Sequence, residues 1–379
     1  MRPLLAPLAL LLLTACGSSV AGPSGDDCGT GPFFTVLPVA LADIDVVGVT
    51  GGLGAPGHTL PTPQAYLYLS AEGAAVHAPG PMQITRLRRT TYITSPRRQG
   101  KTDFTAEFQV CQQVSGWLAH LTTLAASIPS PSGGWKDCQR YNTATETVET
   151  CSGALDNFTL AAGAPLGTGG LSIALGLMGL DFGLLDSRVD NFFVARWRFP
   201  DGHLHAVCPW EQFDPATKAQ LYGKFGDKSR PSTVPAGEPR CGTMAVDVAG
   251  TAKGVWALSS QTAPLGGDET TYITLANYPF RPQDQLALSL GPDALGATVA
   301  VVPRANSGRL NRAFEQVTND GLIYCYGPDV ERPGSNWLLS LTGPNALSIR
   351  KVASTPAVPN ICSTDPSTWS LAGAVSMVR

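Results

Sequence analysis

Five histidines are the residues best suited to chemistry in this chain, and few of them could act together. His58 stands in a Gly/Pro loop before a strand-like run at 65–69, and His120 lies in the middle of the first half. His203 and His205 form an H-x-H pair. On a strand this spacing directs both imidazoles to one face, which suits a zinc site. The alternative is a hairpin end carrying two hydrated histidines.

Two aspartates, Asp181 and Asp186, could complete a site with these histidines. If His58, His120 and Asp181 converged in space, they would supply the three protein ligands that a catalytic zinc needs. The alternative is that the aspartates form a hydrogen-bonded turn or an ion pair with Arg188 or Arg196. We therefore take His58, His120, Asp181 and Asp186 as candidates to line a ligand groove.

Three segments of the first half resemble motifs of the lysostaphin-like zinc endopeptidases, which cut peptidoglycan cross-links. Residues 76–84 (VHAPGPMQI) look like the family's V-x-A-P-x-x-G-x-V corner, and residues 117–122 (WLAHLT) are similar to its Y-G-H-L-S segment. Residues 162–170 (AGAPLGTGG) resemble its glycine turn. The segments occur in the family's order and cover about residues 46–198. The resemblance implies a small antiparallel β-sandwich with a zinc ion in a groove across the sheet.

The catalytic positions depart from the family's pattern. The family's first ligand pair is H-x-x-x-D, but His58 is followed four residues later by Thr62. Its terminal H-L-H-F should follow the glycine turn, where this chain has LDFG at 180–183. Only His120 occupies a family position, that of a residue assisting catalysis, so it is the one catalytic candidate. The resemblance thus implies a domain without metal or cofactor. The alternative is a divergent zinc peptidase with relocated ligands, drawn from His58, His120, Asp181, His203 and His205.

The N-terminus indicates export and lipid anchoring. Arg2 precedes an apolar run at 4–13, which is shorter than the ~20 residues that span a bilayer and typical of a signal-peptide core. The run ends in Leu-Thr-Ala-Cys at Cys16, which resembles the bacterial lipobox, where the cysteine sulfur receives diacylglycerol. We predict an extracytoplasmic protein held at the cell membrane or outer membrane through Cys16. The alternative is an ordinary secretory signal.

Eight cysteines remain beside Cys16, and an even set in an exported chain favours disulfides over metal thiolates. They are Cys28, Cys111, Cys138, Cys151, Cys208, Cys241, Cys325 and Cys362. Spacing suggests that Cys138 pairs with Cys151, which would close a short polar loop. We also expect Cys208 to pair with Cys241 and Cys325 with Cys362.

Composition excludes other classes of function. The net charge is −3, and the sequence lacks a stripe of Lys and Arg, which argues against nucleic-acid binding. One local basic patch exists, which we interpret as the solvated faces of a strand pair and its loop: Arg86, Arg88, Arg89, Arg97, Arg98 and Lys101. The serine-hydrolase elbow G-x-S-x-G does not occur in the sequence.

The pattern of apolar and β-branched runs between Gly/Pro clusters predicts a mainly β protein. Expected strands in the first half include 34–39, 65–69, 83–87, 91–94, 105–110 and 190–197. Residues 114–128 have a weak helical spacing, and 215–225 predict a short helix with Asp214 as its N-cap. In the second half, Asn319-Asp320-Gly321 predicts a hairpin between 314–317 and 322–326.

These patterns predict a β-rich first domain, which the resemblance implies to be an antiparallel β-sandwich, followed by a second all-β domain. The expected divisions are a signal peptide (1–15), a lipidated tether (16–33), a lysostaphin-like domain (34–227), a linker (228–240) and a C-terminal domain (241–379). We interpret the protein as a non-catalytic envelope lipoprotein that binds peptidoglycan or an envelope protein. The alternatives are the divergent zinc peptidase and a structural or adhesive lipoprotein.

Overall fold

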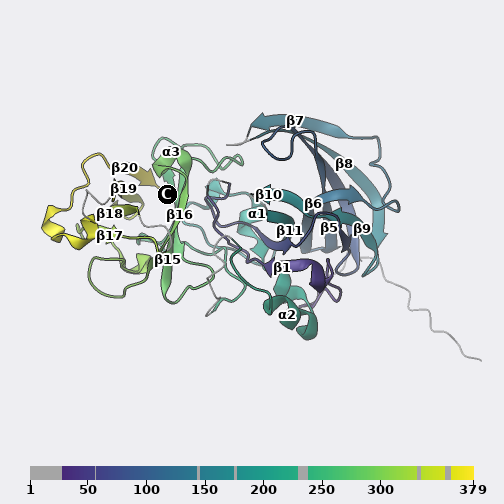
Figure 1. Ribbon diagram of the computed structural model, residues 1–379, viewed down its shortest axis with the longest axis horizontal. Helices are drawn as coiled ribbons and strands as arrows, with labels where there is room; N and C mark the ends of the chain where they lie inside the picture. The colour runs from purple at the N-terminus through teal and green to yellow at the C-terminus, as the bar shows by residue number, and fades with distance from the viewer. Residues whose placement is uncertain are drawn as a thin grey trace, which may run out of the picture.

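The computed structural model describes residues 28–55, 57–142, 146–174, 177–228, 238–330, 334–354 and 360–379. Cys16 and the predicted signal peptide therefore lie outside the described residues, as does most of the predicted linker. Among the described residues, no helix is both long and apolar enough to cross a membrane. The chain forms two β-rich parts that lie side by side, the first at the right of Figure 1 and the second at the left.

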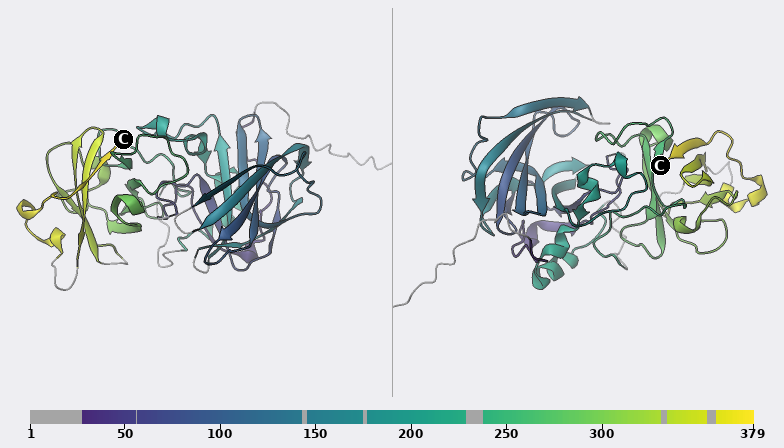
Figure 2. Two further views of the ribbon diagram at one scale, coloured as in Figure 1. Left: turned by 90° about the horizontal axis from the view of Figure 1, so that it is seen from above. Right: turned by 180° about the vertical axis from the view of Figure 1, so that it is seen from behind.

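The first part is built on one antiparallel sheet. Its main path has the order β1 (Ile44–Val47), β2 (Gln64–Leu69), β11 (Leu177–Asp186), β6 (Val114–Leu124), β5 (Thr102–Cys111), β4 (Met82–Thr94), β8 (Thr147–Leu160) and β7 (Lys136–Asn142). Four short strands join it, namely β3 (Ala74–His77), β9 (Pro165–Gly169), β10 (Leu171–Ala174) and β12 (Ala206–Val207). The sheet curls into a nearly closed, barrel-like layer, seen from two further sides in Figure 2.

The second part is another antiparallel sheet. Its order is β16 (Thr298–Pro303), β15 (Gln285–Leu290), β14 (Tyr272–Asn277), β13 (Gly254–Leu258), β20 (Val375–Val378), β19 (Ala346–Ala353), β18 (Ser335–Gly343) and β17 (Tyr324–Tyr326). The predicted class, mainly β with antiparallel sheets, is confirmed.

The helices are short. The α-helices are α1 (Asp201–Leu204), α2 (Pro215–Tyr222) and α3 (Pro292–Leu295). Single 3-10 turns are η1 (Leu41–Asp43), η2 (Arg196–Arg198), η3 (Pro209–Gln212), η4 (Phe314–Gln316), η5 (Ile361–Ser363) and η6 (Pro366–Thr368). The predicted helix at 215–225 is confirmed as α2, and the Asp214 side chain accepts the backbone N–H groups of Ala216 and Thr217.

Two strand predictions and one hairpin prediction were wrong, each for a packing reason. Residues 34–39 and 190–197 are not strands, because aromatic side chains such as Phe34 and Phe193 pack into the core from irregular backbone. The hairpin at 314–326 is replaced by η4 and β17, and the Phe314 ring stacks on Tyr326 with centroids 4.6 Å apart.

Most of the weak helical pattern at 114–128 belongs to strand β6, which ends at Leu124, and a bulge explains the misleading spacing. Ala106 of β5 pairs with Leu118, whereas Phe104 pairs with Leu121. One extra residue is therefore inserted in β6, so that two core-facing leucines stand three positions apart, as they would on a helix.

Each part has its own apolar core, and a third core joins the two. The joining core takes Leu60, Phe193 and Leu204 from the first part and Val255 and Tyr272 from the second. All five side chains are buried. The two sheets are thus packed against each other through apolar side chains.

Four disulfides cross-link the described residues. Cys138–Cys151, Cys208–Cys241 and Cys325–Cys362 form as predicted, and Cys28 pairs with Cys111. Cys208–Cys241 connects the first part to the segment that leads into the second.

Candidate functional site

The candidate site lies on the polar face of the first sheet, opposite its apolar core. Strand register defines this face, because side chains alternate along each strand. Leu180 and Leu67 pair on the core side, whereas Asp181 pairs with Tyr66 and with Ala119 on the other side. The polar face therefore carries Asp181 and Tyr66 at neighbouring positions.

His120 reaches this face because of the bulge in β6. Its backbone has φ +66°, in the left-handed region that non-glycine residues seldom adopt. A bulge of this kind turns a side chain out of the regular alternation and is common next to functional sites. The His120 side chain, 20% exposed, is thereby placed between β5 and β11.

Two buried carboxylates hold the His120 ring, one at each nitrogen. Nδ1 lies 2.8 Å from Asp103 Oδ2, and Nε2 lies 3.5 Å from Asp181 Oδ2. Asp103 is 3% exposed and Asp181 8%. Burial by itself would lower the pKa of His120, but the charge of Asp181 and the hydrogen bond to Asp103 outweigh it and raise the pKa to about 10. The two carboxylates therefore favour the protonated, positively charged form of the ring at neutral pH, with Nδ1 hydrogen-bonded to Asp103 and Nε2 paired with Asp181.

A second layer of polar groups supports Asp103. The Tyr92 hydroxyl donates to Asp103 Oδ2 at 2.8 Å, and Arg98 Nη1 donates to the Tyr92 oxygen at 3.0 Å. Arg98 in turn forms an ion pair with Glu146. Burial and the nearby charge of Asp103 raise the pKa of Tyr92 far above its ordinary value, so its hydroxyl stays protonated as a donor.

The opposite side of the cluster is completed by the second part of the chain. His58 Nδ1 lies 4.0 Å from Glu269 Oε1, and the other oxygen of Glu269 accepts the backbone N–H of Leu60 at 2.7 Å. The rings of His58 and Tyr66 have centroids 6.4 Å apart. Burial lowers the pKa of His58, but Glu269 and Asp181 outweigh it and raise the pKa above its ordinary value. The predicted residues His58, His120 and Asp181 therefore share one electrostatic cluster.

Asp186 does not belong to this cluster. It lies at the far end of β11, where both of its oxygens accept from Arg188, at 2.8 and 2.7 Å. The guanidinium of Arg188 lowers the pKa of Asp186 below its usual value. Asp186 thus forms the ion pair that was the alternative to a groove position.

The H-x-H pair is split between two environments. His203 lies on α1 and is buried in the core that joins the two parts, with its ring centroid 5.9 Å from that of Phe199. Burial lowers the pKa of His203. His205 Nδ1 instead lies 2.6 Å from the backbone oxygen of Val189. The interpretation as a zinc site on a strand was wrong, because residues 201–204 form helix α1. The interpretation as a hairpin end with two hydrated histidines was also wrong, because the His203 side chain is buried in the core.

The residues of the cluster do not fit a zinc ion. Within the described part of the chain, no group of three or more His, Cys, Asp or Glu side chains is arranged to hold a metal. Metal binding requires a free lone pair on a neutral imidazole. Both nitrogens of His120 face carboxylate oxygens instead, so its ring has no lone pair directed at a shared cation.

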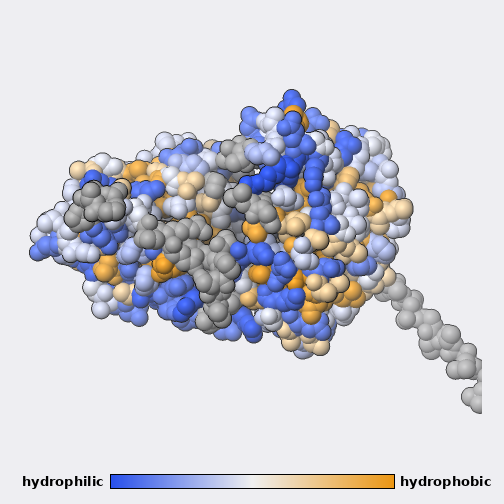
Figure 3. Space-filling model, in the orientation of Figure 1, coloured by the Kyte–Doolittle hydropathy of each residue, from blue (hydrophilic) through white to orange (hydrophobic). Residues whose placement is uncertain are grey.

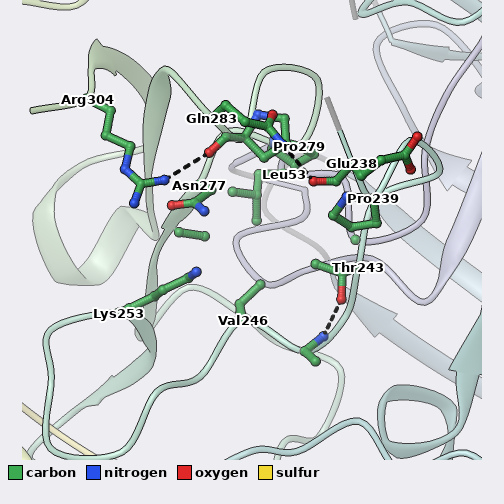
Figure 4. Close-up of a pocket in the computed structure, with 15 residues that line it drawn as sticks. Leu53, Glu238, Pro239, Thr243, Val246, Lys253, Asn277, Pro279, Gln283 and Arg304 are labelled. Carbon is green, nitrogen blue, oxygen red and sulfur yellow. Dashed lines mark hydrogen bonds between the residues drawn. The ribbon is translucent and has the colours of Figure 1, made fainter. Parts of the chain in front are cut away.

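A small cavity of about 210 Å³ lies between the two parts, away from this cluster (Figure 4). Pro239, Pro279 and Pro282 contribute to its walls, and Lys253 and Arg304 reach its polar side. Arg304 Nη1 donates to the backbone oxygen of Pro282 at 3.3 Å. Burial lowers the pKa of Lys253.

Sequence reasoning missed Asp103, Tyr66 and Glu269. Asp103 offered one local signal, because a lone carboxylate inside a strand-like run must find a partner when it is buried. Glu269 offered none, since it stands 209 positions from Leu60, whose amide it accepts.

The three segments that resemble lysostaphin-like motifs lie next to one another. β3 and β9, from the corner and the glycine turn, pair with each other, and β9 also pairs with β6. No protein-family model, curated protein or solved structure matches this chain. The family resemblance stays a prediction.

Proposed function

We propose that this protein is a lipid-anchored extracytoplasmic protein whose first part binds a cell-envelope ligand on the polar face without catalysing a reaction. The observation that carries the proposal is the His120 ring held between Asp103 and Asp181. An imidazolium fixed at both nitrogens cannot accept a proton as a general base. It is instead a fixed positive charge that orients two carboxylates.

The surroundings of the cluster favour binding of a polar chain with apolar faces. Tyr66 and Tyr68 stack with centroids 5.8 Å apart, and both are partly exposed. Trp117 is partly exposed on the same face and lies against Gly183. Aromatic rings beside carboxylates suit a glycan or a peptide, because rings cover apolar faces while carboxylates accept hydrogen bonds. We propose peptidoglycan or an envelope protein as the partner.

Retention on purified peptidoglycan sacculi tests the binding proposal. A soluble form that begins after Cys16, residues 17–379, is mixed with sacculi and the bound fraction is measured after sedimentation. We expect retention, and an at least fivefold lower affinity for Trp117→Ala and Tyr66→Ala. The matched control is Trp197→Ala, because Trp197 is 57% exposed and is not on the polar face. The proposal would be overturned if the wild-type chain bound neither sacculi nor any protein in a pull-down from the cell envelope. It would also be overturned if Trp197→Ala weakened binding as much as Trp117→Ala and Tyr66→Ala.

Metal content separates this proposal from a divergent zinc peptidase. We expect well below one zinc per chain after dialysis against trace zinc. One zinc per chain, lost in His120→Ala or His58→Ala, would overturn the non-catalytic proposal and lead to peptidoglycan-cleavage assays.

The anchor is tested separately in bacterial cells that express the full chain. We expect the wild-type protein to partition into the detergent phase after Triton X-114 extraction, and Cys16→Ser to move to the aqueous phase. Aqueous partitioning of both would contradict the lipid anchor and leave the binding proposal standing.

A further inference from the structure

The edge strand β7 is held in place without a core of its own. All seven of its residues are exposed, so burial of apolar side chains does not explain its position. Pairing with β8 and the Cys138–Cys151 disulfide fix it instead. In Figure 1 the strand arches across the top of the first part. A covalently fixed strand that contributes nothing to the core is available to form one wall of a binding site.

Beside β7 lies an open cavity of about 540 Å³. Lys136 pairs with Ser152, which pairs with Arg88 of β4, so these three side chains project from the same face of three adjacent strands. This is the polar face that also carries the His120 cluster, but the cavity lies at its β7 end. Its volume is within the ordinary range for small-ligand sites, roughly 300–1,000 Å³.

The cavity has a positive lining. Arg86, Arg88 and Lys136 carry three positive charges against the one negative charge of Asp137. Glu107 lies behind the arginines, 3.7 Å from Arg86 Nε and 2.9 Å from Arg88 Nε, and lowers the local excess to one. The two guanidinium side chains are still 56% and 43% exposed. Hydrophilic side chains gather at β7 at the top of Figure 3. An anionic group fits this lining better than a cation or an apolar ligand.

The uncharged part of the lining matches a sugar. Tyr141 is 50% exposed and lines the cavity, which offers a ring face to an apolar face of a pyranose. Hydroxyl and amide groups surround it, from Ser132, Gln139, Thr150 and Ser152. Such groups both donate and accept hydrogen bonds, as sugar hydroxyls do.

We propose that this cavity binds a carboxylate-bearing saccharide, with the sugar ring against Tyr141 and the carboxylate between Arg86 and Lys136. A sugar carboxylate can come from a uronate or from the lactyl group of N-acetylmuramic acid. The site stands on the β7 geometry alone, so it does not depend on what binds at the His120 cluster.

Calorimetric titration of the soluble form that begins after Cys16, residues 17–379, tests the proposal. The probes are tetragalacturonate, the disaccharide of N-acetylglucosamine and N-acetylmuramic acid, neutral maltotetraose and inorganic phosphate. We expect one of the two acidic saccharides to bind at least tenfold more tightly than maltotetraose, and the stronger one identifies the source of the carboxylate.

Variants then locate the site. We expect Arg86→Gln and Lys136→Gln each to weaken binding of the acidic saccharide about tenfold, the effect of losing one charge-assisted hydrogen bond. Tyr141→Ala should weaken saccharide binding and leave phosphate binding unchanged. The controls are Lys351→Gln and Phe192→Ala, which replace an exposed cation and an exposed aromatic ring outside the cavity.

Three results would overturn the proposal. The first is that maltotetraose binds as tightly as the acidic saccharides, which removes the role of charge. The second is that the cavity variants behave like the controls. The third is that phosphate binds as tightly as the saccharides and Tyr141→Ala has no effect, which leaves a site for bare anions only. Far-ultraviolet circular dichroism and melting curves show that each variant is folded, and the exposure of β7 makes folding failure of Lys136→Gln and Tyr141→Ala unexpected.

Discussion

Replacing His120 with glutamine tests the physical reasoning about the polar cluster most directly. The substitution removes the positive charge between Asp103 and Asp181, which are 3% and 8% exposed. Tyr92 remains as a donor to Asp103, whereas Asp181 Oδ1 has no hydrogen-bond partner among the described residues. Removing one partner of a buried ion pair costs about 3–5 kcal/mol, because a carboxylate is left without compensation. We expect His120→Gln to lower the free energy of unfolding by that amount at pH 6.

Guanidinium denaturation with intact disulfides measures this free energy. The matched comparison is His120→Gln/Asp181→Asn, which also removes one of the two buried charges. We expect the double variant to be at least about 1.5 kcal/mol more stable than the single variant, since an unpaired buried charge is the main cost. Equal stability of the two variants, or a loss below about 1 kcal/mol in His120→Gln, would refute the reasoning.

The same charge predicts a pH dependence. The folded pKa of His120 is about 10, against 6.5 for an unperturbed histidine. Because the folded pKa is raised, the stabilisation is fully present below pH 6.5 and is lost as the pH rises to 10, at about 1.4 kcal/mol per pH unit. Nuclear magnetic resonance of the His120 ring, assigned by its absence in His120→Gln, should show no titration between pH 5.5 and 8. A titration midpoint of the ring near pH 6.5 would contradict the conclusion that Asp103 and Asp181 stabilise its protonated form.

Three further predictions follow from packing and burial. Gly183→Ala should destabilise the fold by about 1–3 kcal/mol, because an added Cβ would lie 2.1 Å from ring atoms of Trp117; a melting temperature equal to the wild type would show that the ring can move away. Cys138→Ser/Cys151→Ser should release β7 alone, so that hydrogen exchange in residues 136–142 accelerates at least tenfold while β5 and β6 keep their protection; a large fall in global stability would contradict this. Lys253 should react with a small acylating reagent at pH 7.5 ahead of the exposed Lys351, because burial lowers its pKa and leaves more free amine; mass spectrometry that finds Lys351 modified first would refute it.

The β class and three disulfide pairings could be predicted from the sequence because both depend on local signals. Alternating apolar runs and Gly/Pro corners identify strands, and short polar loops bring cysteines such as Cys138 and Cys151 together. The strand around His120 was harder to recognise, because the bulge changes the apolar spacing from two to three. The spacing of apolar residues therefore did not predict a strand at the bulge, which is the position that turns the His120 side chain toward the polar face.

The composition of the polar cluster could be predicted only in part. His58, His120 and Asp181 were identified by residue type, since ionisable side chains in a chain with 15% charged residues are conspicuous. Asp103 was missed because the pairing of β5 with β6 places it beside His120, and Glu269 was missed because the packing of the two parts places it beside His58. Asp186 was assigned to the groove together with Asp181, although Asp181 lies in the middle of β11 and Asp186 is its last residue, five positions further on.

The apolar core shared by the two parts has a consequence for how this chain can be divided or recombined. A fragment that stops near residue 228 would expose Leu60, Phe193 and Leu204 to water, and a fragment that begins there would expose Val255 and Tyr272. Such fragments would aggregate or require a solubilising partner. Glu269 would also be missing from the amide of Leu60. The two parts therefore have to be kept together. An exchange of either part between related chains would succeed only if the residues that form the shared core were exchanged with it.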